Sequence, residues 1–161
     1  VCSSDLRGQK VVQSFGKRKS CIEDTLMIKA YLNELANMLG NYERTSESLK
    51  YFSDNDSNTK RIADEMIPYI KSRQETLVRM YKVTEKKDIG ENTDYIRQYI
   101  LADKEMLRLQ TEITKNKYEI SKYHISDVRR KNFEERRNRL EKELEPFKKW
   151  EKQLREKIFN S

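Results

Sequence analysis

The stretch YIRQYILADKEMLRLQTEITKNKYEISKY, residues 95–123, contains the clearest heptad repeat in this chain. Its apolar residues follow an alternating spacing of four and three, and Tyr99, Met106, Ile113 and Ile120 lie seven residues apart. A seven-residue repeat averages 3.5 residues per turn, which is typical of an α-helix that packs in a left-handed coiled coil. The stretch therefore predicts a long helix with one narrow apolar seam.

The rest of the chain shares this character, because residues that form turns are scarce. The 161 residues include only two prolines and four glycines, and 38% of them are charged. Large apolar residues still recur at helical spacing, which disordered segments rarely show, and the Glu/Lys/Arg/Leu-rich composition is typical of long coiled helices. These features predict an all-α protein that works through its surfaces and partners.

Three helices are predicted from the apolar spacing and the residues that favour helix ends. They are expected to run from near Lys17 to Tyr42, from Asn58 or Thr59 to Tyr123, and from Ser126 or Asp127 to the end of the chain. The starts of the last two are marked by residues that favour N-cap positions. A proline inside a helix removes a hydrogen bond, so we expect kinks near Pro68 and Pro146. Around residues 88–92 the pattern weakens, which predicts a second bend or a short break, and residues 43–52 are expected to be helical.

The predicted fold is an elongated antiparallel three-helix coiled coil, a curved rod. Residues 15–161 would form its single domain, and residues 1–14 are expected to be disordered or a foreign remnant. Its seam would form the core or a dimer interface through Leu32, Leu35, Leu39, Tyr99, Met106, Ile113, Ile120, Leu140, Phe147 and Leu154. Asn116 is a polar seam position that can set the register, while Arg137 and Glu151 interrupt the seam of the third helix.

Positive charge is concentrated around the predicted turn between the second and third helices. The chain has a net charge of +7 at pH 7, and residues 115–142 hold ten Lys or Arg side chains against five Asp or Glu. Such a patch indicates an anionic partner, either a lipid surface or nucleic acid, although a solvated helix face has the same composition. The residues expected to contact the anionic surface are Lys115, Lys117, Lys122, Arg129, Arg130, Lys131, Arg136, Arg137 and Arg139.

Residues suited to catalysis or metal binding are sparse. His124 is the only histidine, which excludes a catalytic pair that needs a second histidine and a metal site with several His ligands. Cys2 and Cys21 lack metal-ligand spacing and are too few for a disulfide framework, which indicates a reducing compartment; Cys21 is expected to be a small, partly buried apolar residue. The sequence has no glycine-rich phosphate loop and no apolar run of about 20 residues. We therefore predict no enzymatic activity, no cofactor and no metal.

Two short phrases resemble the BAR domains of endosomal sorting nexins. ANMLGNYE at residues 36–43, preceded by KRK at residues 17–19, is similar to the first helix of that family. In the family, this helix begins with a basic phrase and ends with an MLGN phrase. DYIR at residues 94–97 is similar to a phrase in the family's second helix. The order of helix, loop, long bent helix, basic turn and third helix also agrees. The resemblance covers roughly residues 15–161.

The resemblance implies a PX-BAR sorting nexin of the retromer-associated type, of which this chain would be a fragment without the phosphoinositide-binding PX domain. Such a domain is a three-helix crescent that forms an antiparallel homo- or heterodimer and senses or induces curvature of anionic endosomal membranes. Basic residues on its concave face and at the helical turn would meet the lipid. The expected protein is cytoplasmic and peripheral on the endosome, acts in sorting and trafficking, and has anionic phospholipids and retromer-type coat proteins as partners.

Two other functions fit the same features. A structural coiled-coil adaptor, in a cytoskeletal or tethering protein, would have the same helices and no preference for anionic lipid. A nucleic-acid binder would use the same cations, but the interleaved acids repel phosphates and no recognition motif is visible, so nucleic acid is not an expected partner.

Overall fold

The structure is a computed structural model that describes residues 9–51, 57–86 and 94–160, with the side chains of α1 described from residue 23 onward. The described residues form four helices and no strand. The helices are α1 (Gln9–Leu49), α2 (Ser57–Lys86), α3 (Tyr95–Ile120) and α4 (Val128–Asn160). The chain is therefore all-α, as the sequence predicts.

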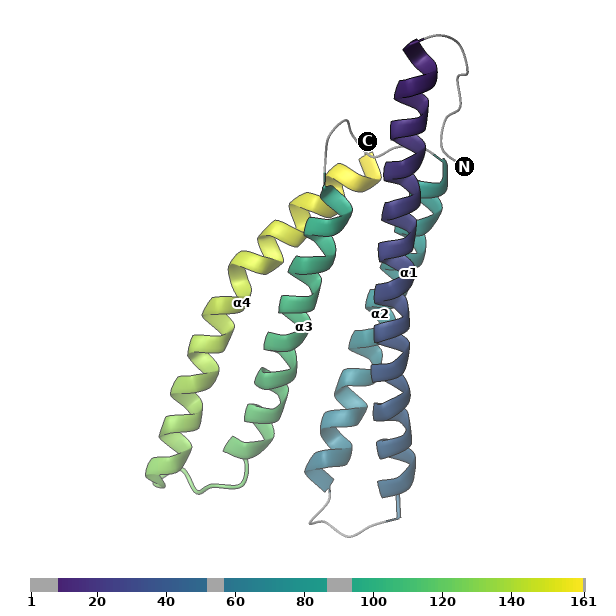
Figure 1. The fold of residues 1–161 in the computed structure, drawn as a ribbon. Helices are drawn as coiled ribbons and strands as arrows, with labels where there is room; N and C mark the ends of the chain where they lie inside the picture. Colours follow the sequence, from purple (N-terminus) through teal and green to yellow (C-terminus); the bar gives the residue numbers. More distant parts are fainter. Residues whose placement is uncertain (1–8, 52–56, 87–93, 161) are drawn as a thin grey trace.

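The helices alternate in direction and form two hairpins, α1 with α2 and α3 with α4 (Figure 1). The end of α1, the start of α2 and the α3–α4 turn lie at one end of the molecule, which we call the turn end (Figure 1). The end of α2, the start of α3 and the end of α4 lie toward the other end (Figure 1). The hairpins lie closer together there than at the turn end (Figure 1).

The predicted count of three helices is wrong, because the segment expected as one bent helix over residues 59–123 is divided. α2 ends at Lys86, α3 begins at Tyr95, and the two run in opposite directions. The expected bend or break at residues 88–92 lies outside the described residues. Reversal of the chain allows the apolar faces of α2 and α3 to pack within one molecule, whereas a continuous rod would leave an apolar stripe in water.

Helix boundaries follow local capping chemistry in part. α4 begins directly after Asp127, whose Oδ1 accepts a hydrogen bond from the Arg129 backbone N–H at 2.9 Å, so the predicted N-cap is confirmed. α2 begins at Ser57, slightly before the predicted start, and the Asn58 side chain donates to the Tyr118 carbonyl oxygen of α3 at 3.4 Å. α1 extends from Gln9 to Leu49 and so includes residues 43–49.

Among the residues whose side chains the structure describes, the core consists of two apolar clusters. The larger one draws on all four helices, through residues such as Leu35, Leu77, Tyr99 and Ile158. The smaller one joins α3 to α4 nearer the turn end, and its buried members are Met106, Leu109, Ile113, Leu140 and Leu144. Full burial of an aliphatic side chain of this size contributes about 2 kcal/mol, so these clusters supply the main force that holds the helices together.

The predicted seam residues lie inside the molecule. Buried within the single chain are Leu35, Tyr99, Met106, Ile113, Ile120, Leu140 and Leu154, and partly buried are Leu32, Leu39 and Phe147. The polar seam position Asn116 is also buried, at 5% exposure. Pro68 and Pro146 lie inside continuous helices, and the kinks expected at them stay predictions.

Candidate functional site

The basic segment that the sequence singles out forms the turn end of the α3–α4 hairpin. The last residues of α3 pass into a compact turn in which the Lys122 and Tyr123 backbone N–H groups donate to the carbonyl oxygens of Glu119 and Ile120. The Tyr123 ring stacks on Phe133 of α4 with a centroid distance of 5.6 Å. The turn is therefore packed against the start of α4 and presents its cations in fixed directions.

Two arginines hold the start of α4. Arg129 donates from Nε and Nη2 to the Asp127 carboxylate at 3.1 and 2.8 Å, which lowers the pKa of that carboxyl group. Arg130 donates to the Tyr123 carbonyl oxygen at 2.9 Å and to Glu134 at 3.0 Å. Both side chains were predicted as lipid contacts, but in this structure their hydrogen bonds stabilise the turn and the start of α4.

Most of the predicted lipid-binding cations have a carboxylate partner within 4 Å. The six pairs are Lys117–Glu65, Lys122–Glu119, Arg129–Asp127, Arg130–Glu134, Arg136–Glu112 and Arg137–Glu141. Among the described residues, Lys115, Lys131 and Arg139 have no such partner and are exposed. An exposed ion pair is worth only about 0–1 kcal/mol, so a paired cation can still change partner, but it presents less net charge to an anionic surface.

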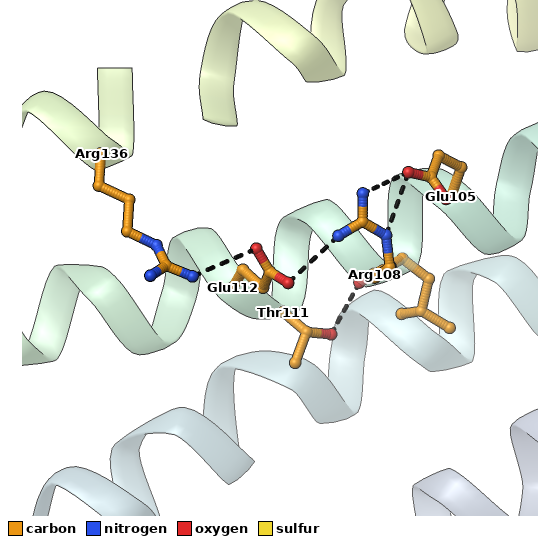
Figure 2. A network of polar contacts seen from close by, with 6 residues as sticks. Glu105, Arg108, Thr111, Glu112 and Arg136 are labelled. Atoms are coloured by element: carbon orange, nitrogen blue, oxygen red, sulfur yellow. Dashed lines mark hydrogen bonds and ion pairs between the residues drawn. The ribbon is translucent and has the colours of Figure 1, made fainter. Parts of the chain in front are cut away.

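Figure 2 shows how one of these cations is engaged between α3 and α4. Arg136 of α4 lies 3.8 Å from Glu112 of α3, and the other oxygen of Glu112 lies 3.2 Å from Arg108. Arg108 also pairs with Glu105, which raises the pKa of its guanidinium and lowers that of the Glu105 carboxyl group. This ladder of alternating charges stabilises the hairpin and neutralises most of the charge along that face.

Shallow grooves separate the two hairpins. One of 390 Å³ lies between α1 and α3 and another of 390 Å³ lies nearer the turn end, where α1, α2 and α3 contribute to its walls. Lys115 borders both grooves, and Lys122 borders the second, together with the acid Glu119. An unpaired cation at a groove between helices can meet an anionic group that approaches from solvent.

A buried polar cluster links all four helices, α1, α2, α3 and α4, and we call it the four-helix cluster. It lies away from the α3–α4 turn. Its central residue is Asp103 of α3, whose side chain is fully buried. The Tyr31 hydroxyl of α1 donates to Asp103 Oδ2 at 2.5 Å, and Arg73 Nε of α2 lies 3.2 Å from Asp103 Oδ1. Glu151 of α4, 5% exposed, lies beside them and is 3.9 Å from Arg155. One side chain from each helix therefore meets at a single point.

The environment of this cluster favours one proton on Glu151. Burial, and then the negative charge of Asp103, raise the pKa of the Glu151 carboxyl group to about 8. Burial also raises the pKa of Tyr31 and Tyr99, and it raises that of Tyr69 to about 12. Because both carboxyl groups are nearly inaccessible to water, the cluster is arranged to hold the hairpins in register rather than to meet a substrate.

The remaining candidate residues form no reactive group in the described part of the chain. His124 is exposed in the turn, with Nδ1 2.8 Å from the Ser126 hydroxyl oxygen. Cys2 and the side chain of Cys21 lie outside the described residues. Within the described ranges, no three His, Cys, Asp or Glu side chains are grouped to hold a metal ion. None of the helices described is long and apolar enough to cross a bilayer.

The four-helix cluster is the feature that sequence reasoning missed. Glu151 gave a partial signal, because it interrupts the apolar line of the third predicted helix. Asp103 and Arg73 gave none, since isolated charges in a highly charged helix are read as solvent-facing. The i,i+4 pairs Arg130–Glu134 and Arg137–Glu141 could have been read from their spacing.

Comparison of the chain with protein-family models, with curated proteins and with solved structures finds no significant match to any of the three. The fold and the distribution of charge are therefore the findings on which a functional proposal rests.

Proposed function

We propose that this chain is a peripheral membrane-binding module that recognises anionic lipid surfaces through the turn end of the α3–α4 hairpin. The observation that carries the proposal is the exposed, unpaired state of Lys131 in the first turns of α4, with Lys115 and Arg139 exposed and unpaired farther along α3 and α4. Each Lys or Arg close to an anionic bilayer contributes about 1 kcal/mol, so a few such cations bind a membrane without a pocket. The excess of positive charge in residues 115–142 supports the same surface.

The finer assignment comes from the resemblance to sorting-nexin BAR domains. On this proposal the module acts on endosomal membranes, senses or induces curvature, and works as a dimer with retromer-type coat partners. Most of the seam residues that would pair two chains are buried inside one chain in this structure. A dimer through those seams would therefore require the helices of one chain to separate from one another.

A structural coiled-coil adaptor is the second candidate, and one observation favours it. Six of the nine predicted lipid-binding cations are paired with carboxylates. A hairpin whose charges compensate each other is suited to remain soluble beside a partner rather than to bind an anionic surface. The adaptor would bind no vesicle of any composition, which separates it from the membrane proposal.

Neutralisation of the unpaired cations is expected to weaken vesicle binding at least tenfold. The variant Lys115→Gln/Lys131→Gln/Arg139→Gln removes three positive charges without breaking an ion pair, so its helices should remain intact. Binding is measured by co-sedimentation with vesicles that contain an anionic lipid, at low and high salt. Because the contribution is electrostatic, the difference between variant and wild type should shrink as the salt concentration rises.

The matched control is Lys148→Gln/Lys149→Gln/Lys152→Gln, which removes the same charge from exposed positions in the second half of α4. The proposal predicts that this control binds almost as wild type does. Equal losses in the two variants would contradict a surface at the turn and would show attraction by net charge alone.

A further inference from the structure

Two aliphatic side chains project into solvent at the α3–α4 turn. Ile125 is 79% exposed and Val128 is 73% exposed. Single exposed apolar residues are common on proteins, but these two flank Asp127 within one turn. Tyr51, 87% exposed, follows α1 at the same end of the bundle. The turn end therefore combines the charge described above with the most exposed large apolar side chains of the described residues.

The backbone that carries the aliphatic pair is fixed. The Asp127 backbone N–H donates to the His124 carbonyl oxygen at 2.9 Å, which closes a β-turn with Ile125 at its second position. The bond from Arg130 to the Tyr123 carbonyl oxygen ties the first turn of α4 to the same segment. A turn held in this way loses little conformational entropy when a partner buries its side chains.

The charges beside the pair suit a surface that is both anionic and apolar. Asp127 is the only acid in residues 121–131. Its carboxylate is held by the backbone N–H and the guanidinium of Arg129. Lys131, exposed and without a carboxylate partner among the described residues, lies one turn of helix beyond Val128. No unpaired negative charge of residues 121–131 would oppose contact with lipid phosphates.

We propose that Ile125 and Val128 form an apolar wedge that enters the headgroup region of an anionic bilayer while Lys131 meets the lipid phosphates. The inference rests on the proposed membrane function and adds to it a contact that salt does not screen. Apolar groups at a membrane interface bury a few ångströms below the headgroups, a depth that a short protruding turn can reach. A protein partner would need a concave pocket to receive the protruding turn, whereas a bilayer accommodates a convex turn without such a pocket.

The test compares wild type with Ile125→Ser/Val128→Ser in the same vesicle co-sedimentation. The expected result is about tenfold weaker binding to anionic vesicles, from the loss of two partly buried aliphatic side chains. The ratio should be the same at low and high salt, unlike the ratio for the neutralised cations. Ile125→Leu/Val128→Leu should bind as wild type does, and Leu101→Ser, at a 57% exposed position in α3, is the matched control.

Circular dichroism checks that the variants fold, which is expected because both side chains are exposed. If wild type binds anionic vesicles and the double serine variant binds equally well, the wedge is refuted and the proposed function stands. If wild type binds no vesicle, both fail. A wild-type dimer that the serine substitutions convert to a monomer would assign the pair to a second copy of the chain and overturn the wedge.

Discussion

Replacement of Arg73 by methionine is expected to lower the free energy of unfolding by about 3–5 kcal/mol, because it leaves a buried carboxylate without its cation. Arg73 Nε lies 3.2 Å from Asp103 Oδ1, and the Asp103 side chain has no exposed surface. The guanidinium also lies over the Tyr69 ring, 3.6 Å from its centroid, so its packing is lost as well. Urea denaturation followed by circular dichroism measures the change.

Two further variants separate the loss of charge pairing from a general loss of packing. Arg79→Met removes an exposed arginine of the same helix that lies over Phe159, and it is expected to cost at most about 1 kcal/mol. Arg73→Met/Asp103→Leu removes both charges and is expected to recover part of the stability, since an apolar pair carries no desolvation penalty but the buried Tyr31 hydroxyl loses its acceptor. A loss below about 1 kcal/mol for Arg73→Met alone would show that the cluster does not hold the helices together.

Stability is expected to fall as the pH rises from 4.5 to 8, because in this range the unfolded chain releases the Glu151 proton that the folded chain retains. Its pKa of about 8 in the folded chain lies above the ordinary value of 4.5, so the folded state binds a proton that the unfolded chain releases. The stabilisation from this group is complete below pH 4.5 and is lost as the pH rises through 8. The slope between those values is about 1.4 kcal/mol per pH unit.

The measurement is the free energy of unfolding in urea at several pH values from 6 to 9. Carboxyl groups with lowered pKa, such as those of Asp64 and Asp127, do not titrate in this range. Glu151→Gln imitates the protonated side chain, so its stability should change little from pH 6 to 9, while that of wild type falls up to pH 8 and then levels off. A wild-type curve as flat as that of the glutamine variant would contradict the assignment of the proton to Glu151.

Sequence periodicity was sufficient for the parts of the fold that depend on one helix at a time. The heptad of residues 95–123 identified the buried face of α3, including Asn116, and the spacing of Leu140 and Leu154 identified that of α4. Asp127 was recognisable as an N-cap because capping involves only neighbouring residues. These features depend only on residues close together in the chain, so they can be predicted from the sequence.

The features that sequence reasoning missed depend on contacts between helices. The number of helices changed because the chain reverses between Lys86 and Tyr95, a choice decided by which apolar faces can pack together. The four-helix cluster forms only where four helices meet, so the residues next to Arg73 and Asp103 in the sequence do not indicate that these two side chains are buried. The partners of Lys117 and Arg136, on α2 and α3, were likewise hidden until the helices were placed side by side.

On the proposed function, the chain recognises an anionic bilayer through the turn end of the α3–α4 hairpin. The most direct test of this function is flotation of the wild-type protein with neutral vesicles and with vesicles of rising anionic lipid content, at low salt. We expect no flotation with neutral vesicles and a steep rise with anionic lipid, which high salt largely reverses. Equal flotation with both vesicle types, or none with either from a folded protein, would contradict the proposed function.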